Sequence, residues 1–226
     1  IKSSKFIFNE IKKYLKKNNK LNDEWYALNI LSNNASTVGS YDLDIFSSEN
    51  FENNTLQKIK NNEFSLIFLF GQDNLKFKKK NEFVIYIGSH GDKGAEISDL
   101  ILPGSAYTEQ DGYFTNIEGK IQKAHKSSYP PGEAREDWKI LNELSKFIKR
   151  KNLFESKKQL LDEMMMYIKN KKEKKASDFE KNEFLSENIL VKDIDYYYSN
   201  VISRSSKTMN ECRNEKLKLH KTGTEG

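Results

Sequence analysis

The residues that could do chemistry gather in residues 88–138, which hold seven of the eleven glycines and all three prolines. Gly88, Gly91 and Gly94 lie between a predicted strand and a predicted helix, a position at which many proteins bind a phosphate or a dinucleotide. Their spacing matches neither G-x-G-x-x-G nor G-x-x-x-x-G-K-[ST], the glycine patterns that cradle phosphates. We therefore favour a tight strand-to-helix turn over a nucleotide site.

Two pairs of polar residues in the same stretch have the side chains that an acid and a base require. His90 and Asp92 form the first pair, and Glu109 and Glu118 form the second. Neither pair is accompanied by a nucleophile or by a set of metal ligands. We favour a loop histidine that is hydrogen bonded to the backbone and glutamates that anchor turns, so we expect no catalytic residue in this chain.

Cysteine and histidine are too scarce to suggest a metal centre. The chain has one cysteine, Cys212, and three histidines that are far apart in the sequence. An iron–sulfur cluster needs about four ligands, mostly cysteines, and no histidine or cysteine has zinc-site spacing. Cys212 also lacks a local signature of a nucleophile and sits in a polar tail. We expect no metal and no cluster in this chain.

The net charge of +5 is carried almost entirely by lysine, since only four of the 38 basic residues are arginines. Proteins that read bases or phosphates favour arginine, whose planar fork binds two acceptors at once. A nucleic-acid-binding module, which would bind any duplex in a salt-dependent way, is therefore the third-ranked alternative. The abundant Lys, Asn, Ile and Phe indicate an A/T-biased genome, such as that of an organelle.

The ends and the apolar runs of the chain bear on its location. No apolar run approaches the roughly 18–20 residues of a membrane span, so no direct membrane insertion is expected. Residues 1–20 are amphipathic and lysine-rich, without the apolar core of a secretory signal. We expect either synthesis inside an organelle or earlier removal of a targeting peptide.

The elements that position the glycine-rich stretch alternate between strand and helix. Residues 65–71 and 82–88 are continuous apolar runs that suit strands buried on both faces of a parallel sheet. Residues 99–103 predict a third strand, reached through a short helix over residues 93–98. A helix of one or two turns is expected between the first two strands. This rhythm predicts an α/β domain with a partial parallel sheet and a helical C-terminal extension.

Other segments have the periodicity of helices or the composition of turns. Apolar spacing predicts helices over residues 4–19, 23–33, 50–61, 133–149 and 156–171. Residues 35–48 are rich in turn formers, and residues 104–129 predict an extended, partly hairpin-like excursion.

Three domains are expected from these elements, namely an α/β part over residues 1–150, a helical extension with a charged linker over 151–188, and a tail over 189–226. The tail is expected to dock on the chain's own core or on a partner. Its last residues are expected to be disordered.

The central stretch resembles the molybdopterin-oxidoreductase-type domain. Its pattern has a Pro-ended apolar run, then Glu, Gly, Asn and Glu-Gly, and appears here as Ser98-Asp99-Leu100-Ile101-Leu102-Pro103, Glu109, Gly112, Asn116, Glu118-Gly119 and Gln122. Lys120 stands where the pattern usually has Arg. Within that superfamily the chain is similar to the C-terminal portion of the large iron–sulfur subunit of respiratory NADH:ubiquinone oxidoreductase (complex I). Residues 24–45, 66–74, 130–141 and 194–209 share this similarity.

The resemblance implies a structural role for the motif residues, which are Gly88, His90, Gly91, Gly94, Asp99, Pro103, Glu109, Gly112, Asn116, Glu118, Gly119, Arg135 and Trp138. It also implies that this chain has no cofactor, and that the iron–sulfur clusters and FMN lie on partner chains. The expected partners are the N-terminal cluster-bearing portion of the subunit on a separate chain, a flavoprotein and other matrix-arm subunits.

The expected location is the matrix side of the mitochondrial inner membrane, with the gene in the mitochondrial genome. The main alternative is the C-terminal fragment of a catalytic molybdopterin oxidoreductase, such as a formate dehydrogenase. Because a sheet without its neighbours exposes an edge and apolar patches, the isolated chain is expected to aggregate or to be partly unfolded.

Overall fold

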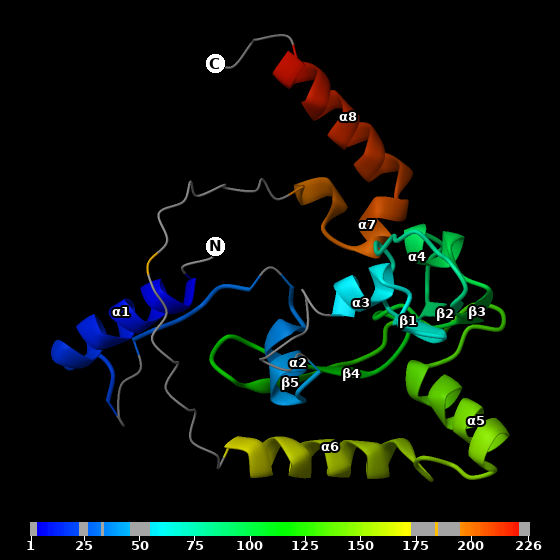
Figure 1. The fold of residues 1–226 in the computed structure, drawn as a ribbon, viewed down its shortest axis with the longest axis horizontal. Helices are drawn as coiled ribbons and strands as arrows, with labels where there is room; N and C mark the ends of the chain where they lie inside the picture. Colours follow the sequence, from blue (N-terminus) through cyan, green and yellow to red (C-terminus); the bar gives the residue numbers. More distant parts are fainter. Residues whose placement is uncertain are drawn as a thin grey trace. The chain divides into compact units, whose positions relative to one another are not determined.

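The computed structural model describes residues 4–22, 27–32, 34–45, 55–172, 184 and 195–221. The chain folds as two compact units that alternate along the sequence (Figure 1). Unit 1 contains Ile1–Ile45, Tyr113–Gln122 and Asp162–Lys192, and unit 2 contains Phe46–Gly112, Lys123–Leu161 and Asp193–Gly226. The parallel sheet and most of the predicted site residues belong to unit 2.

The sheet of unit 2 has three parallel strands in the order β1-β2-β3. These strands are β1 (Leu66–Phe70), β2 (Phe83–Gly88) and β3 (Leu100–Pro103). In their register, Phe68 of β1 pairs with Ile85 of β2, and Ile85 pairs with Leu100 of β3. The two continuous apolar runs therefore form adjacent parallel strands, and the α/β prediction is confirmed.

The two faces of the central strand β2 are covered by different layers. On one face, Leu69, Val84 and Tyr86 form a buried cluster against Leu75 and Phe77 of the β1–β2 connection and against Ala95 and Ile97 in and after α4 (Lys93–Glu96). On the other face, α5 (Asp137–Lys149) places Ile140 against Ile85 and Ile87. Figure 1 shows α4 and α5 on opposite sides of the strands. The core of unit 2 thus lies on both sides of β2.

Burial on both faces was predicted for the first two strands and holds only for β2. Residues Val84 to Ile87 are at most 7% exposed, which fits a central strand. In β1, Leu66, Phe68 and Phe70 are 47%, 43% and 44% exposed, so the prediction is wrong for one face of this strand. The reason is that α5 contacts β2 and β3 on that face and, among the described residues, does not extend over β1.

Most predicted helices are present, with shifted ends. The helices outside the sheet layers are α1 (Ser4–Lys17), α2 (Thr37–Asp42), α3 (Leu56–Lys60), α6 (Lys157–Lys172), the 3-10 turn η2 (Tyr196–Tyr198), α7 (Val201–Ser205) and α8 (Lys207–Lys221). The helix predicted from residue 133 begins at Asp137, because Arg135 first forms a parallel bridge with Gly104. Parts of three other predictions lie outside the described residues. They are the start of the helix predicted over 50–61, the charged linker at 173–178 and the disordered end at 222–226.

Three local predictions are wrong. Residues 27–32 of the helix predicted over 23–33 are not helical. Ile30 and Leu31 are 64% and 82% exposed there, so no packed apolar face supports a short helix. The β1–β2 connection has no helix either, because Leu75 and Phe77 reach the core from an extended loop. The segment 35–48 contains α2 as well as the expected turns.

The excursion after β3 contains the predicted hairpin. Its strands β4 (Gly112–Thr115) and β5 (Ile121–Ala124) form a two-stranded sheet. Gly119 has a φ of +80°, a left-handed conformation that glycine adopts without strain, and its amide donates to the Asn116 carbonyl. In the described part of the chain, no helix has both the length and the apolar character that crossing a membrane requires.

Replacement of Asn142 by alanine is expected to lower the free energy of unfolding by about 1–2 kcal/mol. Asn142 joins α5 to the loop before α6, since its Oδ1 accepts from the Leu153 and Phe154 amides at 2.7 and 3.0 Å and its Nδ2 donates to the Phe154 carbonyl at 2.8 Å. Thermal unfolding followed by circular dichroism measures the change. Asn152→Ala, which removes one 3.4 Å contact to Glu155, should change stability by less than about 0.5 kcal/mol; equal effects would contradict the assignment.

Candidate functional site

The candidate site lies at the carboxyl ends of β2 and β3, where open α/β sheets bind their ligands. Gly88 ends β2 and pairs in register with Pro103, which ends β3. His90, Gly91 and Gly94 follow directly in the connection to α4. The glycines therefore lie between a strand and a helix, as the sequence predicted, and the question is whether the carboxyl ends of the strands leave room for a ligand.

The glycines of the turn are packed against the protein's own atoms. A Cβ added at Gly88 would lie 2.2 Å from the Tyr86 hydroxyl oxygen, and one added at Gly94 would lie 2.5 Å from the Gln72 carbonyl oxygen. Only Gly91 has open space, since no atom lies within 4 Å of its added Cβ. Two of the three glycines thus serve close packing, which agrees with a tight turn and does not fit a phosphate cradle.

Tyr86 occupies the space beneath the turn. Its hydroxyl lies against Asp73 Oδ1 and 2.7 Å from the His90 carbonyl oxygen, both of which can accept its proton. Burial of the ring, followed by the hydrogen bond to the Asp73 carboxylate, raises the pKa of Tyr86 above its ordinary range. The His90 ring is half-buried, with Nδ1 2.9 Å from Ser89 Oγ. Tyr86 therefore fixes the turn through the backbone of His90.

Asp92 serves as a helix cap and as an ion-pair partner. Its Oδ1 accepts from the Lys93 amide at 2.8 Å, and its Oδ2 accepts from Arg204 Nε at 2.9 Å. Burial alone would raise the pKa of Asp92, but the Lys93 amide and the Arg204 guanidinium together lower it. Both carboxylate oxygens thus bind groups other than the His90 ring, which agrees with the structural role that the sequence favoured for Asp92 over an acid–base pair.

The C-terminal tail packs on this turn within unit 2. The turn and the tail enclose a hollow of about 660 Å³, lined by Asn74, Gly91, Asp92, Lys93, Asp195, Tyr198, Arg204 and Ser205. The other arginine of the tail, Arg213, contacts Asp195 at 2.6 Å and stacks 4.6 Å from the centre of the Tyr198 ring. Arg204, which lines the hollow, and Arg213, which contacts the lining residue Asp195, are therefore both paired with carboxylates of the same unit.

Replacement of Arg204 by methionine is expected to lower the free energy of unfolding by about 1 kcal/mol at pH 7. Arg204 helps to lower the pKa of Asp92 below its ordinary value of 3.8. The ion pair therefore stabilises the folded protein fully above pH 3.8, and this stabilisation is lost as the pH falls through the folded-state pKa of Asp92. Urea unfolding at pH 7 and pH 3 measures both values. Lys207→Met removes a charge that is 91% exposed and should have almost no effect, so equal losses for the two variants would refute the tail–turn contact.

Asp99 lies at the amino end of β3, whereas Arg135 lies beside its carboxyl end and Trp138 lies in the first turn of α5. Asp99 Oδ2 accepts from the Val84 amide at 2.8 Å, and its carboxylate pairs with Lys79. The hydrogen bond from Lys79, followed by that from Val84, lowers the pKa of Asp99. The Arg135 amide donates to the Pro103 carbonyl at 3.1 Å, and Trp138 Nε1 donates to Glu136 Oε2 at 3.1 Å. All three residues thus form hydrogen bonds or ion pairs that hold local structure near the strands.

The remaining predicted residues anchor turns. Glu109 Oε2 accepts from the Ala106 amide at 2.9 Å. Asn116 Oδ1 accepts from the amides of Glu118 and Lys120, and its Nδ2 donates to Glu118 Oε2 at 3.3 Å. Gly112 begins β4. Glu109 belongs to unit 2 and Glu118 to unit 1, and each has hydrogen-bond partners within its own unit.

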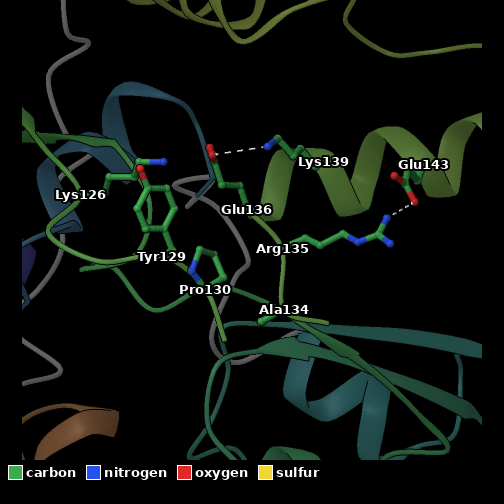
Figure 2. A pocket seen from close by; sticks show the side chains of 8 residues that line it. All are labelled: Lys126, Tyr129, Pro130, Ala134, Arg135, Glu136, Lys139 and Glu143. Atoms are coloured by element: carbon green, nitrogen blue, oxygen red, sulfur yellow. Dashed lines mark hydrogen bonds and ion pairs between the residues drawn. The ribbon is translucent and has the colours of Figure 1, made fainter. Parts of the chain in front are cut away.

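A second hollow, of about 470 Å³, lies beside the start of α5 (Figure 2). Its cations face local partners, with Arg135 2.6 Å from Glu143, Lys139 3.6 Å from Glu136, and Lys126 4.4 Å from the centre of the Tyr129 ring. Glu136 also pairs with Lys157 at 2.7 Å. The cations of this hollow thus pair with Glu136 and Glu143 or lie over the Tyr129 ring, and each has a partner within the same unit.

The structure adds residues that the sequence did not single out, namely Asp73, Tyr86, Gln110 and Arg204. Tyr86 could have been noticed as the one hydroxyl in the apolar run 83–87, since a buried hydroxyl requires a partner. Gln110 Nε2 donates to Asp137 Oδ2 at 3.0 Å, and burial raises the pKa of Asp137 despite this hydrogen bond. Nothing in the sequence pattern predicted the partners of Arg204.

In the described ranges, no three His, Cys, Asp or Glu side chains gather as metal ligands.

Comparison with protein families gives two matches along the chain. The family model described as molybdopterin oxidoreductase matches residues 2–147. A second model, described as the C-terminal region of the NADH-ubiquinone oxidoreductase G subunit, matches residues 165–212. The first match covers the sheet, the glycine-rich turn and most of α5, and the second covers part of the helical extension and tail.

Curated proteins from mitochondria and bacteria are similar to nearly the whole chain. The NADH-ubiquinone oxidoreductase 75 kDa subunit of Reclinomonas americana is 37% identical over 203 residues, 83% of this chain and 28% of that protein. The NADH-quinone oxidoreductase G subunit of Rickettsia conorii is 39% identical over 214 residues, 91% of this chain and 30% of that protein. The mitochondrial NADH-ubiquinone oxidoreductase 78 kDa subunit of Candida albicans is 34% identical, covering 93% of this chain and 31% of that protein. The chain thus spans less than a third of the length of these relatives.

Proposed function

The chain belongs to the molybdopterin oxidoreductase family, its homologues are the large subunits of complex I, and from this membership we propose that it forms the C-terminal part of such a subunit. In this role it supports electron transfer from NADH to ubiquinone by holding the cluster-bearing part of the subunit in place. Its own contribution is structural, because electron transfer between clusters depends steeply on the distances that the surrounding protein fixes.

The observation that carries this proposal is the match of residues 165–212 to the C-terminal model of the G subunit. The first match, over residues 2–147, would suit a catalytic molybdenum enzyme equally well. The second match extends the similarity through α6 and into α8, and the curated relatives follow the chain through both regions in one alignment. This favours complex I over a formate-dehydrogenase-like enzyme.

We propose that this chain binds no cluster, flavin or pterin, and that its partner chains carry the clusters and FMN. One cysteine in 226 residues cannot supply the roughly four ligands of a cluster. The added Cβ atoms at Gly88 and Gly94 would meet protein atoms at 2.2 and 2.5 Å, so the turn does not fit a pterin phosphate.

Purification of the assembly that contains this chain tests the function directly. Iron, flavin and a cluster-bearing protein without molybdenum or tungsten are the expected result, measured by elemental analysis, absorbance and mass spectrometry. Stoichiometric molybdenum or tungsten would instead support the catalytic alternative. Duplex DNA binding that weakens steeply with salt would support the nucleic-acid alternative.

We also propose that the cluster-bearing portion is a separate chain and that the assembly lies on the matrix side of the mitochondrial inner membrane. The A/T-biased composition and the mitochondrial relatives support this location and a mitochondrial gene. An antibody against residues 129–141 should detect a band well below 75 kDa after denaturing electrophoresis of purified mitochondria. A band near the size of the 75 kDa relative would show that both portions share one chain.

A further inference from the structure

One face of β1 is apolar and open among the described residues. Leu66, Phe68 and Phe70 project to this face, and the strand register places Phe83 of β2 beside Leu66. Phe83 is 48% exposed, similar to the three β1 residues, whereas its neighbours Ile85 and Ile87 lie beneath α5. We refer to Leu66, Phe68, Phe70 and Phe83 as the β1 patch.

The outer edge of β1 is open at the same residues. The Gly71 amide donates to the Ile87 carbonyl at 2.8 Å, and the Ser65 carbonyl accepts from the Phe83 amide at 2.9 Å. Because hydrogen-bonding direction alternates along a strand, residues 65, 67, 69 and 71 face β2, and the amides of Phe68 and Phe70 face outward. No strand of the described residues pairs with this edge.

A naturally exposed edge strand would look different. Proteins protect such edges with charged side chains, prolines or bulges, and parallel sheets are normally covered on both faces. The β1 sequence, LIFLF, contains neither a charge nor a proline. A patch of three phenylalanines and a leucine beside an unpaired edge is therefore the surface of an incomplete sheet.

We propose that a β-strand from the remaining part of the large subunit pairs with β1, and that an adjoining helix covers the β1 patch. This inference rests on the proposed function, and it names the surface through which the cluster-bearing portion is held. The occupant is argued from length, because the chain matches only 28–32% of its relatives and the rest of those subunits has no counterpart here. A strand followed by a helix is the unit that extends such a sheet while covering its face.

Hydrogen exchange of the full chain, alone at low micromolar concentration and within the purified assembly, tests the proposal. The amides of Phe68 and Phe70 should exchange at least ~100-fold more slowly in the assembly, because pairing protects them. Phe68→Asp and Phe70→Asp should lower the yield of co-purified cluster-bearing protein about tenfold or more. The matched control is Phe147→Asp on α5, a residue that is 89% exposed outside the patch, and it should leave exchange in β1 unchanged.

The outcomes separate this inference from the proposed function. An assembly without a cluster-bearing protein overturns both. An assembly that contains one, but in which the Phe68 and Phe70 amides still exchange as fast as in the chain alone, overturns only the docking surface. Protection of these amides in the chain alone, together with a dimer in sedimentation, identifies a second copy as the occupant and also overturns it. Because the exchange experiment uses the wild-type chain, it does not depend on the folding of the variants.

Discussion

A Gly94→Ala protein is expected to unfold about 6–12 °C below the wild-type protein, a loss of about 3 kcal/mol. The added methyl group would lie 2.5 Å from the Gln72 carbonyl oxygen and 3.3 Å from Tyr86 Cδ2. The carbonyl belongs to the backbone, and the next residue along binds Gly94 itself, since the Gly94 amide donates to the Asp73 carbonyl at 2.9 Å. The methyl group can be accommodated only by moving α4 away from the β1–β2 connection.

Gly91→Ala is the matched control for this substitution. The two glycines are three residues apart in the same turn, but an added Cβ at Gly91 meets no atom within 4 Å. Gly91→Ala should therefore change the melting temperature by less than about 2 °C. If both variants were equally destabilised, the cause would lie in backbone conformation and not in close packing, and the packing assignment would be wrong.

The three strands and the glycine-rich turn between β2 and α4 could be predicted because they depend on local patterns. Apolar runs such as 82–88 indicate strands without any knowledge of their neighbours, and Gly or Pro at the strand ends marks where the chain turns. The same reasoning failed for β1. Its run of five apolar residues predicts burial, but burial also requires a covering element, and the described residues include none over that face.

Contacts between distant residues account for what the sequence could not reveal. Arg204 pairs with Asp92 across 112 positions, and Gln110 reaches Asp137 across 27. Neither contact follows from periodicity or from turn composition, because both depend on how the tail and α5 pack in three dimensions. The sequence predicted a tight turn at Gly88 and Gly94. Only the structure shows why a side chain would not fit there, since the Tyr86 side chain lies against Gly88 and the Gln72 backbone lies against Gly94.

Tyr86→Phe is expected to reduce the free energy of unfolding by about 2 kcal/mol at pH 7. The ring is 1% exposed and would keep its packing in the buried cluster with Leu69 and Val84. The loss comes from the hydroxyl, whose removal deprives the Asp73 carboxylate and the His90 carbonyl of their shared donor. Urea unfolding monitored by tryptophan fluorescence measures the change.

Tyr167→Phe provides the matched control, because it removes the same kind of hydrogen bond from an exposed position. The Tyr167 hydroxyl donates to Asp44 Oδ2 at 2.7 Å, and its ring is 47% exposed. Water can replace the lost partner there, so the expected change is below about 0.5 kcal/mol. Equal losses at the two positions would mean that burial of the Tyr86 hydroxyl does not matter.

The pH dependence of the Tyr86→Phe effect tests burial independently. Burial, followed by the Asp73 carboxylate, raises the pKa of Tyr86 above 10.0, so the folded protein holds the phenolic proton more tightly than the unfolded chain does. The stabilisation is therefore complete below pH 10 and is lost as the pH rises through the folded-state pKa. The difference in unfolding free energy between wild type and Tyr86→Phe should be constant from pH 7 to 9 and should narrow above pH 10. A difference that stays constant above pH 10 would show that the hydroxyl ionises equally well in the folded protein, and the Tyr86 support for the turn would have to be abandoned.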